Sequence, residues 1–172
     1  IALSLSSLLN IDKSIIAHRL TSPWAPGEIS FAQLFLHADD TDSLSKAYPF
    51  HLARPLDKIL PDLGHLSDWS IEWKWDGIRA QMIIRNKEIF LWSRGEELIS
   101  NRFPEFKLLL DGGLDNIVLD GEIVPFKNGM PLPFGSLQKR MNRKAVGKKL
   151  MVEIPILFIC YDILEHCGQD IR

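Results

Sequence analysis

A lysine between two tryptophans is the first candidate for chemistry in this chain. Residues 72–79 are Glu-Trp-Lys-Trp-Asp-Gly-Ile-Arg, and apolar side chains alternate with charged ones up to Asp76. A period of two is typical of a half-buried β-strand, so Lys74 shares a face with the carboxylates of Glu72 and Asp76. On that face, Glu72 is placed to contact a polar edge of a ligand.

The pair Asp76-Gly77 is a strong hairpin signal, which predicts paired strands at 70–75 and 78–85 with Lys74 opposite Arg79. Like charges at directly opposite positions destabilise a hairpin, so this pairing indicates a functional reason. A neighbouring guanidinium and partial burial both favour the neutral amine of a lysine, which is a nucleophile. An arginine offers a planar fork for a phosphate. The pattern predicts an amine directed at a phosphorus atom, with a surface hairpin of solvated charges as the alternative.

A second pair of carboxylates lies in the apolar segment 117–124. Asp120 and Glu122 share one face of a predicted strand with Val118 and Val124. Burying two carboxylates among apolar neighbours is costly unless a cation, a metal ion or a hydroxyl group meets them. The alternative is a strand-end carboxylate in solvent.

Two further side chains are candidates because of the elements that carry them. Arg94 follows a predicted strand and precedes Gly95, on the kind of loop that often presents ligand contacts. A surface ion pair with Glu96 or Glu97 is the alternative. Tyr161 lies in an apolar strand, where an ordinary role in the core is one reading of its ring.

Segment 72–81 resembles the adenylation signature of the covalent nucleotidyltransferases, and its Ala-Gln ending resembles ATP-dependent DNA ligases in particular. Further sequence blocks of this family follow in the same order as in the ligases. Their sequences are most similar to those of a bacterial branch of these ligases. The resemblance covers about residues 48–172. The blocks are Trp92-Ser93-Arg94-Gly95 with Phe103-Pro104-Glu105, Leu119-Asp120-Gly121-Glu122, and the stretch at 158–164 that contains Tyr161.

The resemblance implies a role for each candidate. Lys74 would attack the α-phosphate of ATP and carry AMP, which would pass to the 5′-phosphate of a nick before the 3′-hydroxyl displaces it. Arg94 would touch the nucleotide or its phosphate, and Tyr161 would stack on adenine. Glu122 would contact the ribose or a Mg²⁺ ion held mostly by ATP phosphates. The implied nucleotide-binding set is Glu72, Arg79, Arg94, Glu122 and Tyr161, with Glu122 also the metal contact.

A basic run suggests where DNA would bind. The overall net charge of −2 argues against a general polyanion binder, yet residues 127–152 hold 7 basic and no acidic side chains. Such a run is an electrostatic footprint for a phosphate backbone, and the resemblance implies that the partner is nicked double-stranded DNA. A solvated helix face is the alternative. The predicted nucleic-acid contacts are Lys139, Arg140, Arg143 and Lys144.

Hydrophobic spacing predicts the elements that position these residues. Helices are expected at 4–20, 31–37, 104–111 and 134–142, and strands at 70–75, 78–85, 88–93, 116–124 and 153–163. An acidic linker is expected at 39–45 and an extended, proline-rich lead-in at 48–61. With the resemblance, this predicts an α+β fold: an adenylation (nucleotidyltransferase) domain of antiparallel sheets and packed helices, incomplete, at 46–172. Residues 1–45 are expected to be a remnant of an all-α helical DNA-binding domain.

Composition sets the remaining expectations. No apolar run approaches the ~20 residues that span a bilayer, so no membrane association is expected. Cys160 and Cys167 lack the second Cys or His pair of a zinc site, and the five histidines show no metal spacing. Reduced cysteines and the resemblance imply a cytoplasmic, nucleoid-associated bacterial protein that is monomeric. The chain begins with Ile1 and lacks the family's later blocks, so a piece of a longer protein that ligates slowly alone is expected.

Two other functions stay open at the level of sequence. An RNA ligase or a capping-type nucleotidyltransferase would use the same nucleophile, but it would lack the upstream helical domain and the Ala80-Gln81 dipeptide. A non-catalytic DNA-binding fragment is the alternative of a different class.

Overall fold

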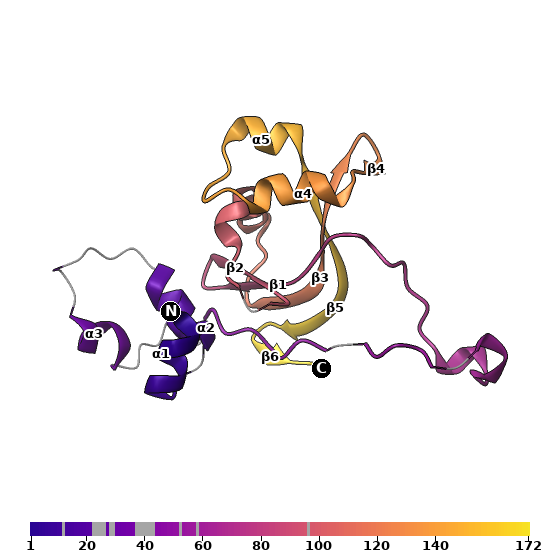
Figure 1. The fold of residues 1–172 in the computed structure, drawn as a ribbon, viewed down its shortest axis with the longest axis horizontal. Coiled ribbons are helices and arrows are strands. Elements are labelled where there is room, and N and C mark those ends of the chain that lie inside the picture. The colour runs from indigo at the N-terminus through magenta and orange to yellow at the C-terminus, as the bar shows by residue number, and fades with distance from the viewer. Residues whose placement is uncertain are drawn as a thin grey trace.

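A curled antiparallel sheet with helices packed against it forms the centre of the computed structural model (Figure 1). The structure describes residues 1–11, 13–21, 27, 30–36, 44–51, 53–57, 59–95 and 97–172. The α+β class predicted from the sequence is confirmed. Among the described residues, no helix combines the length and apolar character that crossing a bilayer requires.

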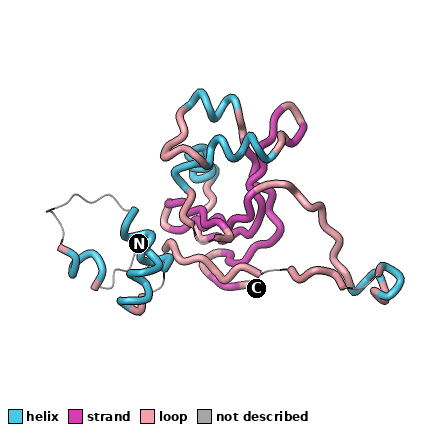
Figure 2. Tube along the Cα trace, viewed as in Figure 1, coloured by secondary structure: helices cyan, strands magenta, loops and turns pink. Residues whose placement is uncertain are grey.

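The elements follow one another in a simple order. Among the described residues, three short helices come first, then a long lead-in drawn mostly as loop (Figure 2), and then the strands with their covering helices. The α-helices are α1 (Ala2–Leu9), α2 (Lys13–Thr21), α3 (Phe31–Phe35), α4 (Phe134–Met141) and α5 (Lys148–Glu153). The 3-10 helices are η2 (Leu60–Asp62), η3 (Leu66–Asp68), η4 (Ser100–Arg102) and η5 (Pro104–Gly112). The strands are β1 (Ile78–Arg85), β2 (Glu88–Ser93), β3 (Ile117–Lys127), β4 (Met130–Pro131), β5 (Ile156–His166) and β6 (Gln169–Asp170).

The sheet has the order β2-β1-β3-β5-β6, with β4 paired to β3, and every pairing is antiparallel. The hairpin between β1 and β2 turns at Asn86 and Lys87, whose φ values are 50° and 59°. Positive φ at both central residues is the geometry that matches the twist of a two-residue hairpin. Four of the predicted strands are present. β3 ends three residues later than expected, and β5 both begins and ends three residues later.

The predicted hairpin at Asp76-Gly77 is wrong, and residues 70–75 form no strand. The reason lies in β1 itself. From Ala80 onward β1 pairs with β2 along one edge and with β3 along the other, so no edge is left for residues 70–75. The lead-in instead leaves the sheet as loop (Figure 2).

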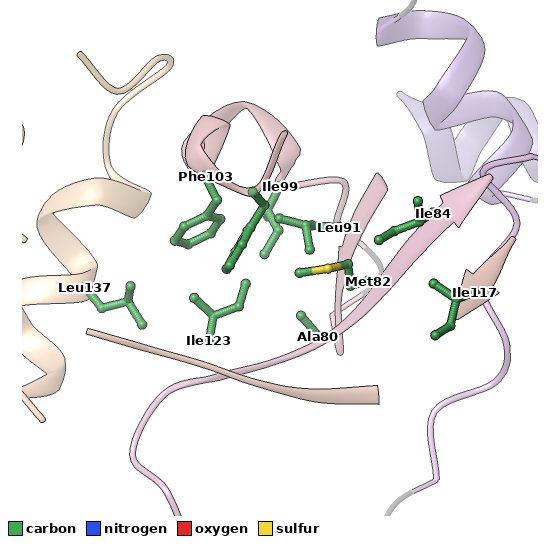
Figure 3. Close-up of a cluster of buried hydrophobic side chains, with 10 residues drawn as sticks. Ala80, Met82, Ile84, Leu91, Ile99, Phe103, Ile117, Ile123 and Leu137 are labelled. Atoms are coloured by element: carbon green, nitrogen blue, oxygen red, sulfur yellow. The ribbon is translucent and has the colours of Figure 1, made fainter. Parts of the chain in front are cut away.

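One face of the sheet carries the larger core, shown in Figure 3. Alternate side chains of β1 meet partners from β2 and β3, and Phe103 and Leu137 close over them from η5's N-terminal end and α4. Each fully buried aliphatic side chain contributes about 1.5–3 kcal/mol relative to an exposed one. The strand residues of this core are Ala80, Met82, Ile84, Leu91, Ile117 and Ile123.

The opposite face is covered by residues 44–48, where the lead-in begins. Trp92 donates from its indole nitrogen to the Ser45 carbonyl at 2.7 Å. The side-chain amide of Gln81 exchanges hydrogen bonds with the backbone of Tyr48, at 2.8 Å to its N–H and 3.0 Å to its carbonyl. These hydrogen bonds to side chains hold residues 44–48 against the sheet, although this segment is not a strand.

An ion pair completes this attachment. The Nε of Arg85 donates to Glu165 at 2.9 Å, and the Tyr48 hydroxyl donates to the same carboxylate at 2.9 Å. Hydrogen bonds from Arg85 are the main cause that lowers the pKa of Glu165. No local sequence pattern predicts this cluster, because its three members lie far apart along the chain.

The helices differ from expectation in their ends. The helix expected at 4–20 is broken by Asn10, which adopts the left-handed conformation at φ 54° and ends α1. The segment expected near 104–111 is 3-10 rather than α-helical, with proline at its start and Gly113 at φ 78° after its end. Helix α5 was not predicted. The proposed linker 39–45 falls mainly outside the described residues, so the boundary at residue 45 stays a prediction.

Candidate active site

Arg79 and Asp120 form the centre of a polar cluster on the sheet face opposite the larger core. The guanidinium donates from Nε to Oδ1 at 2.7 Å and from Nη2 to Oδ2 at 2.7 Å. Asp120 is only 5% exposed, whereas the Arg79 side chain keeps 33% of its surface in solvent. The cation that the sequence required beside Asp120 is Arg79.

Glu122 is met by a hydroxyl group. It lies directly opposite Arg79 in the β1–β3 register, and the Tyr161 hydroxyl donates to its Oε2 at 3.4 Å. The Arg79 guanidinium lies over the Tyr161 ring, 4.9 Å from its centroid, which is a cation–π arrangement. Arg79, Glu122 and Tyr161 are therefore brought together.

A bulge in β5 sets the position of Tyr161. Asp120 pairs with Asp162 and Gly121 pairs with Cys160, so Tyr161 is an extra residue between them. A bulge changes the direction in which a side chain points, and such irregularities are common beside functional sites. Strict alternation along the strand could not have revealed it.

Burial controls the titration of this cluster. Desolvation raises the pKa of Glu122, opposed by the charge of Arg79, the Tyr161 hydroxyl, the Gly77 N–H and the charge of Lys74, in that order. Desolvation and the Glu122 charge raise the pKa of Tyr161 to about 12. The phenol therefore stays a hydrogen-bond donor at neutral pH.

Lys74 and Glu72 lie on the loop that precedes β1, and both are exposed. The charge of Lys74 acts on Glu122, and that of Glu72 on Tyr161, so both charges lie within electrostatic range of the cluster. The predicted opposition of Lys74 and Arg79 is wrong, because Arg79 points to Asp120. A hollow of about 460 Å³ lies beside Lys74, and neither Glu72 nor Arg79 lines it. Its walls are Trp73, Lys74, Trp75, Asp76, Pro131, Leu132 and Pro133.

Two glycines allow the backbones to approach one another. A Cβ at Gly77 would lie within 3.0 Å of the Ile123 carbonyl and the Glu122 side chain. A Cβ at Gly121 would meet the Ile159 carbonyl and the ring of Phe158 equally closely. Gly77 is therefore needed for close packing against β3, and not for the turn that the sequence suggested.

The loop after β2 brings Arg94 to the same end of the sheet. Its backbone N–H donates to the Arg79 carbonyl at 3.0 Å, while its side chain is exposed. Glu97 pairs with Arg102 at 2.9 Å. The other acidic residue weighed as a partner, Glu96, lies outside the described residues.

Residues 50–172 match the family model described as the ATP dependent DNA ligase domain. This chain belongs to that ligase family. A probable DNA ligase of Koribacter versatilis is 33% identical over 141 residues, which cover 79% of this chain and 24% of the relative. A DNA ligase of Archaeoglobus fulgidus is 34% identical over 106 residues, which cover 59% of this chain and 19% of the relative.

Among solved structures, the ligase domain of M. tuberculosis LigD aligns with a TM-score of 0.46 and 26% identity. That alignment covers 58% of this chain and 30% of the other. The part of this chain that aligns with the Koribacter and Archaeoglobus ligases spans about a quarter or less of their length.

The sheet order explains how the ligase-like sequence blocks meet. The blocks lie at the start of β1, after β2, within β3 and within β5, and these four strands are neighbours in the sheet. Asp120 and the bulge at Tyr161 are the parts of this arrangement that were not assigned a site role from the sequence. For Asp120, the sequence signal was its position on the same strand face as Glu122.

The basic run of this ligase-family chain divides into an exposed and a buried part. Lys139, Arg143 and Lys144 are exposed on α4 and the turn after it. Arg140 is fully buried, and its Nη2 donates to Glu105 at 2.6 Å. The structure therefore removes Arg140 from the predicted nucleic-acid contacts.

Proposed function

We propose that this chain carries the adenylylation site of an ATP-dependent DNA ligase. The observation that carries the proposal is the convergence of Lys74, Arg79, Glu122 and Tyr161 on one end of the sheet in a chain of this family. The amine of Lys74 loses a proton and attacks the α-phosphorus of ATP. An N–P bond forms, and the bond to pyrophosphate breaks.

The next two steps seal a nick. The AMP on Lys74 passes to the 5′-phosphate, which releases the lysine, and the 3′-hydroxyl then displaces AMP. These are phosphoryl-type transfers, in which positioning and charge stabilisation supply most of the rate enhancement. Arg79 and Arg94 are suited to hold phosphate oxygens, and Glu122 is suited to accept from a ribose hydroxyl. Glu72 and the ring of Tyr161 complete the proposed nucleotide contacts.

Mg²⁺ fits this site as an ion shared with the substrate. It prefers oxygen ligands and usually takes one or two carboxylates plus phosphates. Both oxygens of Asp120 are engaged by Arg79, so Glu122 is the carboxylate of the cluster left to hold it. Within the described part of the chain, no group of three or more His, Cys, Asp or Glu could hold a metal alone. The ion would offset charge on the departing pyrophosphate.

The proposed substrate is nicked double-stranded DNA, held in part by Lys139, Arg143 and Lys144. Their exposure on one helix and the following turn supports this. We propose a monomer that acts in the bacterial cytoplasm near the nucleoid.

The test is covalent labelling of the full-length protein with radiolabelled ATP and, separately, GTP. Label from ATP is expected, and it should fall to background in Lys74→Ala and Lys74→Arg, because arginine stays protonated and cannot attack. As a control, Lys107→Ala changes a different exposed lysine, which lies on η5, and this variant should label like the wild type. Retained labelling in Lys74→Arg would move the nucleophile elsewhere. Label from GTP alone would indicate a capping-type enzyme, and label from neither nucleotide would indicate a binding fragment.

A further inference from the structure

Arg79 has two carboxylates within reach on β3 and pairs with the less obvious one. Glu122 lies directly opposite Arg79 in the register, whereas Asp120 lies two residues further along the same face. Nevertheless both Nε and Nη2 donate to Asp120. Glu122 accepts instead from the Tyr161 hydroxyl and the Gly77 N–H.

This choice fixes the guanidinium on two sides. Asp120 holds one edge through two bonds of 2.7 Å, and the ring of Tyr161 lies against one face at 4.9 Å. A guanidinium has five N–H donors, so three remain after this pairing. The Arg79 side chain is 33% exposed, so part of it is open to a ligand.

Asp120 itself is not available to a ligand. It is 5% exposed, and each of its oxygens accepts from Arg79. Without its charge, the nearest carboxylate for Arg79 would be the one opposite it on β3. An Arg79–Glu122 pair would then consume the donors and the acceptor that the nucleotide needs.

We infer that Asp120 is a positioning residue of the nucleotide site, which keeps Arg79 and Glu122 apart so that each can bind the ligand. This inference rests on the proposed function. Its rival is that the Asp120 pair only stabilises the sheet.

The chain contains a matched control for this rival. Arg172 donates to Asp170 with the same fork, at 3.0 Å from Nε and 2.8 Å from Nη2. That pair is about half exposed, with side-chain exposures of 44% and 46%, and is not part of the cluster. Asp170→Asn therefore removes a bidentate Arg–Asp pair without touching the site.

The experiment measures Lys74 labelling by ATP in full-length Asp120→Asn, Arg79→Ala, the double variant and Asp170→Asn. The loss of a charge-assisted pair predicts that Asp120→Asn raises the KM for ATP about 10- to 100-fold. The double variant should be no worse than Arg79→Ala, because Asp120 acts through Arg79. Asp170→Asn should stay within about twofold of wild type, since surface pairs contribute little.

Each result decides the matter. Wild-type KM in folded Asp120→Asn, or a further loss in the double variant, would overturn the positioning role while leaving the proposed function intact. If Asp120→Asn does not fold, Arg79→Lys replaces it, because lysine keeps the charge but lacks the fork. A wild-type KM in folded Arg79→Lys would overturn the inference. A wild-type protein that takes no label from ATP would overturn the proposed function and the inference together.

Discussion

Ionisation of Glu122 is disfavoured in the folded state. Its pKa is raised by burial above the ordinary value of 4.5. The free energy of unfolding therefore includes a favourable contribution from protonated Glu122 at pH values below 4.5. This contribution is lost as the pH rises through the pKa that Glu122 has in the folded state. We expect Glu122→Gln to be at least as stable as wild type at pH 7.5, with the difference shrinking towards pH 4. Urea unfolding at the two pH values measures this.

Glu165 is the matched control, because its pKa is shifted in the opposite direction. Hydrogen bonds from Arg85 lower that pKa, so Glu165 contributes stability above its ordinary value of 4.5, which is lost as pH falls through the folded pKa. Glu165→Gln should therefore destabilise the protein at pH 7.5 and do so less in acid. The same sign of pH dependence for both variants would contradict the assigned environments.

At the scale of the elements, Gly121 sets how closely β3 and β5 approach. A Cβ there would lie within 3.0 Å of the Ile159 carbonyl and the Phe158 ring. We expect Gly121→Ala to cost about 1–3 kcal/mol in the free energy of unfolding, the usual cost of overpacking. Gly135 in α4 has nothing within 4 Å of its ideal Cβ, so Gly135→Ala should be neutral or stabilise by up to about 1 kcal/mol. Equal effects in thermal unfolding would contradict this packing.

Arg140 holds α4 against the elements around it. Besides Glu105, it donates to the carbonyls of Arg102 and Ile154, both at 2.9 Å. Arg140→Gln should destabilise by about 3–5 kcal/mol, because it leaves a carboxylate and carbonyls without their partner. Lys139→Gln, the neighbouring change on an exposed position, should stay within about 0.5 kcal/mol of wild type. Urea unfolding of both variants compares them directly.

The same elements show what the sequence could and could not predict. Alternating side chains predicted β1 and β2 correctly because those segments also have partner strands. The alternation in 70–75 is as regular. However, a new strand can form only beside a sheet strand with an unpaired edge, and which edges are unpaired depends on the topology of the whole sheet. Charge counting included Arg140, although its position three residues after Leu137 places both on the buried face of α4.

The site was predicted to a similar extent. A period of two placed Asp120 and Glu122 on one face and required a cation or a hydroxyl, and the structure supplies both. Which carboxylate took which partner was not predictable, because it depends on the bulge that directs Tyr161. The Arg85–Glu165–Tyr48 cluster joins residues separated by up to 117 positions, beyond any local pattern.

At the scale of the whole molecule, a chain of net charge −2 would bind DNA through the distribution of its charges rather than their sum. Lys139, Arg143 and Lys144 are exposed members of the basic run, while Arg140 is buried. We expect the triple change to glutamate at the three exposed positions to weaken binding to a nicked duplex. The slope of log K against log salt should fall by about 0.9 for each phosphate that the variant no longer neutralises.

Leaving Arg140 unchanged keeps this test separate from folding. Labelling of Lys74 by ATP should survive in the triple variant, because the proposed nucleotide site lies on β1, β3 and β5. Fluorescence titrations of nicked DNA between about 50 and 200 mM salt, beside the labelling assay, give both quantities for one preparation. A wild-type salt slope together with abolished labelling would show that these side chains support the nucleotide site and not the DNA. A reduced slope with intact labelling would assign the surface of α4 to the phosphate backbone.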